Sequence, residues 1–113
     1  MTFNFLMRCV FWFAVVLIGT LAMTPTAYLQ DSIFNWWDKA QHVLAFALLM
    51  WLGLLAYPLA RGQLLTGLLL YGLCIELAQH LSGWRVGDWR DAIADAAGVC
   101  VVWALKRARS ADK

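Results

Sequence analysis

Acidic, amide and histidine side chains recur at spacings of three and four residues in three apolar segments of this sequence. The spaced positions are Asp38 and His42 in the first segment, Glu76, Gln79 and His80 in the second, and Asp88, Asp91 and Asp95 in the third. Residues three or four apart share one face of an α-helix, so each segment is expected to present a polar stripe. Charged side chains inside a bilayer cost from about 3 to over 10 kcal/mol, and such stripes therefore indicate a functional cluster.

The predicted cluster contains more acids than cations. Its acids are Asp38, Glu76, Asp88, Asp91 and Asp95, and its cations are Lys39, Arg85 and Arg90. Burial and neighbouring carboxylates favour a protonated carboxyl group, whereas a nearby arginine favours an ionised one. At least one acid is therefore expected to be protonated, paired with His42 or His80, or bound to a cation.

Several kinds of chemistry fit this composition. In a purely structural interpretation, Arg85 or Arg90 bridges Glu76 and Asp91, and the network fixes the register of the helices. In a binding interpretation, the two arginines hold the headgroup of a polar lipid or a cell-wall precursor.

A catalytic interpretation uses a histidine as general base, with His42, His80 and Glu76 as the candidate catalytic residues. No serine elbow, glycine-rich phosphate loop or cysteine nucleophile accompanies them. A metal centre is not predicted, because two histidines on separate segments form no HExxH or comparable ligand motif. No cofactor is predicted either.

The segments that position these residues are predicted to be membrane-spanning helices. The chain has 113 residues, of which 63% are hydrophobic and 14% are charged, against about 45–50% and 25% in soluble domains. Its apolar runs cover approximately residues 6–23, 40–60, 63–81 and 88–105, each close to the length of about 20 residues that crosses a bilayer. The predicted fold is an all-α integral membrane bundle of about four transmembrane helices, in one domain over residues 1–113.

The distribution of lysine and arginine predicts the orientation of this bundle. Six basic residues fall on one side and three on the other: Arg8, Arg61, Lys106, Arg107, Arg109 and Lys113 against Lys39, Arg85 and Arg90. Short cytoplasmic loops carry the excess of basic residues, so both termini are expected in the cytoplasm. The alternative is that the first apolar run is a cleaved signal peptide. A nucleic-acid partner is not predicted, because the net charge is only +2.

An ordered set of these residues resembles a known family. Asp38-Lys39 followed by His42 and Phe46 is similar to the DKxxHxxxF opening of VanZ-like membrane proteins, and Glu76-x-x-Gln79, Arg85, Asp91 and Gly98 resemble that family's ExxQ, R and DxxxNxxG elements in the same order. Asp95 departs from the pattern, since it stands where the family more often has asparagine. This substitution adds a titratable group to the predicted cluster.

The resemblance implies a compact helical membrane domain in the inner (plasma) membrane of a bacterium. It also implies a relationship to a protein that gives low-level resistance to teicoplanin, a glycopeptide that acts on the cell wall. The cluster is expected to bind or act on an envelope component, with membrane lipid and a cell-wall or lipid-linked headgroup as partners. Its predicted members are Asp38, Lys39, His42, Glu76, Gln79, Arg85, Asp91 and Asp95. A membrane enzyme and a structural, partner-binding bundle remain as alternatives, and the sequence leaves an oligomer open.

Overall fold

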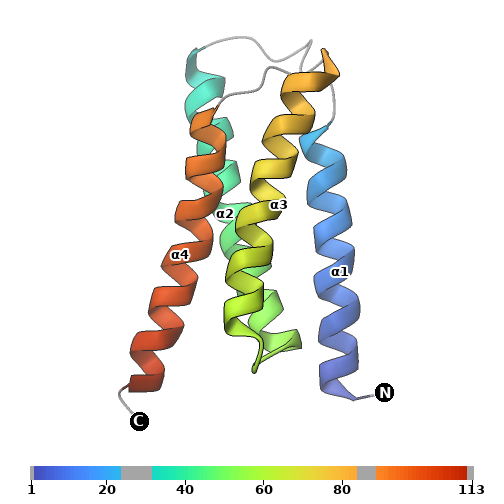
Figure 1. Cartoon of the computed structure of the whole chain (residues 1–113), viewed down its shortest axis with the longest axis vertical. Coiled ribbons are helices and arrows are strands. Elements are labelled where there is room, and N and C mark those ends of the chain that lie inside the picture. The colour runs from blue at the N-terminus through green and yellow to red at the C-terminus, as the bar shows by residue number, and fades with distance from the viewer. Residues whose placement is uncertain (1, 24–31, 84–88, 112–113) are drawn as a thin grey trace.

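The computed structural model is an all-α bundle of four helices (Figure 1). The helices are α1 (Phe3–Ala22), α2 (Ser32–Ala56), α3 (Arg61–Ser82) and α4 (Trp89–Ala111). The structure describes residues 2–23, 32–83 and 89–111, and the side-chain surroundings of residues 2–23, 39–83 and 89–109. Successive helices run in opposite directions, so α1 begins and α4 ends at the same end of the bundle (Figure 1).

Local sequence signals explain where several helices begin and end. The Thr2 side chain accepts a hydrogen bond from the backbone N–H of Phe5 at 3.2 Å, and so satisfies a donor in the first turn of α1. Pro58 follows the end of α2, where the proline ring disfavours helical backbone in the preceding residue. Gly83 ends α3 with φ of 81°, a left-handed conformation that glycine adopts without the penalty of a Cβ.

The observed bounds differ from the predicted runs mainly in α2. This helix begins at Ser32 and ends at Ala56, whereas the apolar run predicts a helix over approximately residues 40–60. Polar residues at its start do not interrupt a helix in the way that they interrupt an apolar run. Asp38 and Lys39 therefore lie within α2, directly before the apolar run that begins at residue 40.

The core of the bundle is centred on α2, whose Phe46, Leu49 and Met50 are fully buried. Its most extensive packing is against α4. Gly98 of α4 lies directly on the α2 backbone, because a Cβ at this position would overlap the Val43 carbonyl oxygen and lie 2.9 Å from the Ala47 nitrogen. A glycine at the contact thus lets two helices approach closely, as small residues do in membrane bundles.

Three of the four helices are long and apolar enough to cross a membrane: α1, the Lys39–Ala56 part of α2, and α3. This confirms the predicted fold class, an all-α bundle, and it makes the chain a multi-pass membrane protein by the length and composition of its helices. The described part of α4 is not among the candidate spans. A fourth crossing and the orientation in the membrane remain predictions.

Candidate functional site

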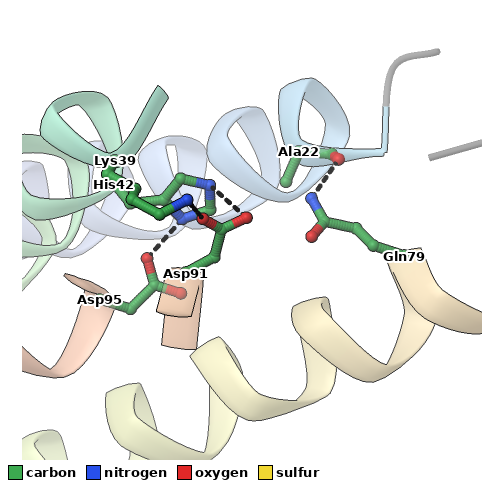
Figure 2. Close-up of polar contacts among 6 residues, drawn as sticks. All are labelled: Ala22, Lys39, His42, Gln79, Asp91 and Asp95. Atoms are coloured by element: carbon green, nitrogen blue, oxygen red, sulfur yellow. Dashed lines mark hydrogen bonds and ion pairs between the residues drawn. The ribbon is translucent and has the colours of Figure 1, made fainter. Parts of the chain in front are cut away.

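A histidine on α2 lies between two aspartates on α4 (Figure 2). The Nδ1 atom of His42 is 2.6 Å from Oδ1 of Asp95, and its Nε2 atom is 3.8 Å from Oδ2 of Asp91. Lys39, one turn before His42, donates a hydrogen bond from Nζ to the other Asp91 oxygen at 3.2 Å. Each ring nitrogen therefore faces a carboxylate, and Asp91 joins the lysine to the histidine.

Helical spacing produces this arrangement from two short sequence segments. Lys39 and His42 are three residues apart on α2, and Asp91 and Asp95 are four residues apart on α4, so each pair shares a helix face. Asp91 and Asp95 are only 4% and 2% exposed. Buried carboxylates are stable only when they are paired or hydrogen-bonded, and α2 supplies the partners.

Asp95 also packs against the backbone of α3 at Gly72. A Cβ on Gly72 would lie 3.0 Å from Oδ2 and 3.1 Å from Cβ of Asp95, so glycine leaves the space that this carboxylate occupies. Gly72 is midway between Arg61 and Ser82, the ends of α3, and at 1.5 Å per residue it is about 16 Å from either end. The Asp95 carboxylate thus lies near the middle of a candidate membrane span.

Gln79 adds a buried amide from α3. Its side chain is fully buried, and Nε2 donates a hydrogen bond to the carbonyl oxygen of Ala22 at 2.7 Å. Ala22 is the last residue of α1, where carbonyl groups have no partner within the helix. The amide oxygen of Gln79 is also buried and accepts no hydrogen bond from any residue that the structure describes. In Figure 2 the Gln79 side chain extends from α3 to the Ala22 carbonyl oxygen, in the same part of the bundle as Asp91.

We refer to Lys39, His42, Gln79, Asp91 and Asp95 as the polar cluster. The structure brings these five predicted site residues to the same part of the bundle, from α2, α3 and α4 (Figure 2). It does not bring His80 to them, because this residue is exposed on α3. Glu76 is half-buried one turn before Gln79 and His80. The predicted positions Arg85 and Asp88 and the side chain of Asp38 lie outside the described parts of the chain.

The described partners within the cluster lie on different helices. Spacing along one helix pairs Asp38 with His42, and this pair stays a prediction because the Asp38 side chain lies outside the described residues; the described partners of the His42 ring are Asp95 and Asp91 on α4. The structural interpretation assigns an arginine to Asp91, whereas the structure places Lys39 there. The Arg90 guanidinium instead lies 5.9 Å from the centre of the Trp89 ring. Partners on different helices depend on helix register, which periodicity within one helix does not contain.

The chemistry of the polar cluster follows from its buried carboxylates. Asp91 and Asp95 are buried and Glu76, one turn before Gln79, is half-buried, whereas the basic groups beside the two aspartates are Lys39 and His42. Such a site suits a ligand that donates hydrogen bonds, such as an amine or a hydroxyl group. Within the described ranges, no group of three or more His, Cys, Asp or Glu side chains has an arrangement that could hold a metal ion.

Comparison with protein-family models, with curated proteins and with solved structures found no match to this chain. The interpretation of the polar cluster therefore depends on its own geometry.

Proposed function

We propose that this chain is a VanZ-like protein of the bacterial inner membrane whose polar cluster binds the headgroup of a lipid-linked cell-wall precursor. The headgroup portion that it recognises carries hydroxyl and amine groups, as sugars and peptides do. Both termini are proposed to face the cytoplasm, which places the polar cluster in the outer half of the membrane, where such precursors are used.

The buried amide oxygen of Gln79 is the observation that carries this proposal. More than about 90% of buried polar groups in folded proteins have a hydrogen-bond partner. This oxygen has none among the described residues, although the same amide group holds the end of α1 through its nitrogen. A donor group on a ligand would complete the hydrogen bonding of Gln79.

The polar cluster also offers a route to the surface. The Lys39 side chain is 29% exposed, whereas the His42 side chain is 10% exposed and the two aspartates are almost fully buried. Exposure thus decreases from Lys39 to His42 and then to Asp95. A headgroup that enters beside Lys39 would meet the carboxylates of Asp91 and Asp95 inside the bundle, where the low dielectric constant strengthens hydrogen bonds.

A binding measurement with two matched variants tests this proposal. The purified chain is placed in nanodiscs, and its melting temperature is measured with and without an undecaprenyl-pyrophosphoryl disaccharide-pentapeptide. A ligand that binds only the folded protein raises its stability by about 2.7 kcal/mol at a hundredfold excess over Kd. We expect the wild type to show this stabilisation and Gln79→Met to lose it.

Tyr71→Phe is the matched control for Gln79→Met. Tyr71 also ties α3 to α1, because its hydroxyl group donates to the Val15 carbonyl oxygen at 2.5 Å. Both variants remove one such hydrogen bond, but only Gln79→Met alters the polar cluster. Equal ligand stabilisation in both variants, or none in the wild type, would contradict the proposal. In that case the cluster is a structural lock between helices.

Glycopeptide sensitivity provides the cellular measurement. We expect expression of the wild type in a sensitive bacterium to reduce sensitivity to teicoplanin, and Asp91→Asn to abolish this effect at equal protein abundance. An unchanged effect in Asp91→Asn would separate resistance from the polar cluster.

A membrane enzyme is the second candidate function, and the His42–Asp95 contact favours it. A carboxylate 2.6 Å from Nδ1 fixes the orientation of the ring, as in catalytic histidine–carboxylate pairs. The histidine would act as general base on the bound headgroup. Turnover of the lipid-linked precursor by the wild type and its loss in His42→Gln, with binding retained, would support catalysis. Binding without turnover would restrict the function to recognition.

A further inference from the structure

An apolar groove lies between α1 and α3, away from the polar cluster. Its cavity has a volume of about 430 Å³. Phe11, Trp12 and Val15 of α1 form one wall, and Leu64, Gly67 and Leu68 of α3 form the other. Of the helix pairs that pack together, α1 and α3 make the least extensive contact, which leaves this space between them.

The walls of the groove indicate what kind of molecule fills it. Both α1 and α3 are long and apolar enough to cross a membrane, so a groove between them faces lipid. Gly67 lines the groove, and the space beside it is open, because a Cβ at this position would meet nothing within 4 Å. A hydrocarbon chain satisfies such walls, whereas water does not.

The charges at the end of the bundle that contains the groove indicate which lipid headgroup fits there. The groove lies in the half of the bundle where α1 and α3 begin and α4 ends (Figure 1). The described side chains of that half include the cations Arg8, Arg61, Lys106, Arg107 and Arg109. The described acids, Glu76, Asp91 and Asp95, belong to the other half. An anionic headgroup therefore complements this end of the bundle.

Arg8 is the cation that the structure fixes at the rim of the groove. Its guanidinium lies 4.7 Å from the centre of the Tyr57 ring, and its Nε donates to the Ala56 carbonyl oxygen at 3.3 Å. Tyr57 lines the groove and accepts a hydrogen bond from the indole nitrogen of Trp12 at 3.0 Å. Arg8 is exposed, and its bond to Ala56 uses Nε, so its two terminal amino groups can donate hydrogen bonds to a phosphate.

We propose that this groove binds one acyl chain of an anionic phospholipid, with the phosphate of that lipid beside Arg8. The site is separate from the polar cluster and does not depend on the function proposed for it. It would anchor α1, the helix with the fewest buried residues, to α3 through a lipid.

Native mass spectrometry of the full chain tests this proposal. The protein is released from nanodiscs that contain equal amounts of phosphatidylglycerol and phosphatidylcholine, and the retained lipids are counted. We expect one retained phosphatidylglycerol in the wild type. Gly67→Leu fills the groove and should lose the lipid, whereas Cys74→Leu, a similar enlargement at an exposed position of α3, should keep it.

Two charge variants test the headgroup contact. Arg8→Gln should retain about fivefold less phosphatidylglycerol, whereas Arg8→Lys should keep most of it because the charge remains. Arg109→Gln removes a charge at the same end of the molecule, away from the groove, and should match the wild type. Arg8→Lys also controls for the fold. Like Arg8→Gln it lacks the guanidinium contacts of Arg8, but it keeps a cation, so a difference in retained lipid between the two variants reports the charge.

Three results would overturn the proposal. Equal retention of the two phospholipids by the wild type would show that the headgroup is not recognised. Retention of phosphatidylglycerol by Gly67→Leu would show that the lipid lies elsewhere. A second copy of the chain in place of the lipid would show that the groove is a dimer interface.

Discussion

The helix pairs α2–α4 and α1–α3 differ in how closely they pack. α4 carries two buried aspartates and packs so closely on α2 that Gly98 lies against the α2 backbone. α1 is a candidate membrane span in which Phe11 and Ala14 are the buried residues, and a groove separates it from α3. The more polar helix is therefore the more enclosed one.

This contrast shows how a membrane bundle can contain a helix that is too polar to count as a span. Lipid covers apolar side chains at no cost, so α1 needs little cover from protein. Carboxylates buried in such a bundle need partners. Here α2 supplies Lys39 and His42, and α3 leaves room for Asp95 at Gly72. In this protein the closest helix packing thus occurs where polar side chains are buried.

The largest loss of stability is expected from adding a Cβ where α4 packs directly on α2. In Gly98→Ala the new Cβ would overlap the Val43 carbonyl oxygen, and backbone atoms cannot move aside as a side chain can. We expect a loss of about 3 kcal/mol or more in stability, measured by thermal unfolding in detergent. Gly67→Ala is the control, because its Cβ meets nothing within 4 Å and alanine favours helix. Similar melting temperatures for the two variants would show that α2 and α4 do not pack this closely.

Removal of the histidine should have the next largest effect. His42→Leu takes away the partner at 2.6 Å from Asp95 and leaves a buried charge, at a cost of about 3 kcal/mol. The double variant His42→Leu/Asp95→Ala has no such charge and should be more stable than His42→Leu alone. Chemical denaturation of the single and double variants measures this coupling. Additive losses would mean that the two side chains do not interact.

A smaller effect is expected at the contact between Asp95 and α3. The Cβ of Gly72→Ala would lie 3.0 Å from an Asp95 oxygen, which requires a shift of the carboxylate and costs about 1–2 kcal/mol. The same substitution should cost less in an Asp95→Ala background. Melting temperatures of the four proteins in this cycle check the prediction, and an equal cost in both backgrounds would place the Asp95 carboxylate elsewhere.

The smallest effect is expected between α1 and α3. Tyr71→Phe removes one hydrogen bond to the Val15 carbonyl oxygen and should cost about 1 kcal/mol. The variant keeps the ring, so packing is unchanged. A loss as large as that of His42→Leu would mean that α1 depends on protein contacts as strongly as α4 does.

The sequence was sufficient to predict four helices, the bundle fold and most residues of the polar stripes, although His80, predicted on the same stripe as Gln79, is exposed. Apolar length and spacing within one helix contain that information, which is why Lys39, His42, Gln79, Asp91 and Asp95 were all predicted. The pairs Lys39–Asp91 and His42–Asp95 were not predicted, because they depend on how α4 is set against α2. The start of α2 at Ser32 was also missed, since apolar runs end at charged residues that a helix accommodates.

The role of Gly72 shows the same limit. A glycine in an apolar segment predicts a close helix contact, and the structure has one. What approaches Gly72 is a carboxylate from α4 rather than a backbone. Only the three-dimensional arrangement of α3 and α4 identifies it.

Thiol labelling of Cys100 tests most directly whether α4 crosses the membrane with its acids covered by α2 and α3. Cys9, Cys74 and Cys100 are exposed on α1, α3 and α4. Variants that each keep one of them, with serine at the other two positions, are treated in intact membranes with a membrane-impermeant maleimide, then again after detergent is added. We predict that all three cysteines react only in detergent, because lipid covers them. Reaction of Cys100 in intact membranes, with Cys9 and Cys74 still protected, would place α4 outside the bilayer and contradict a polar cluster within the membrane.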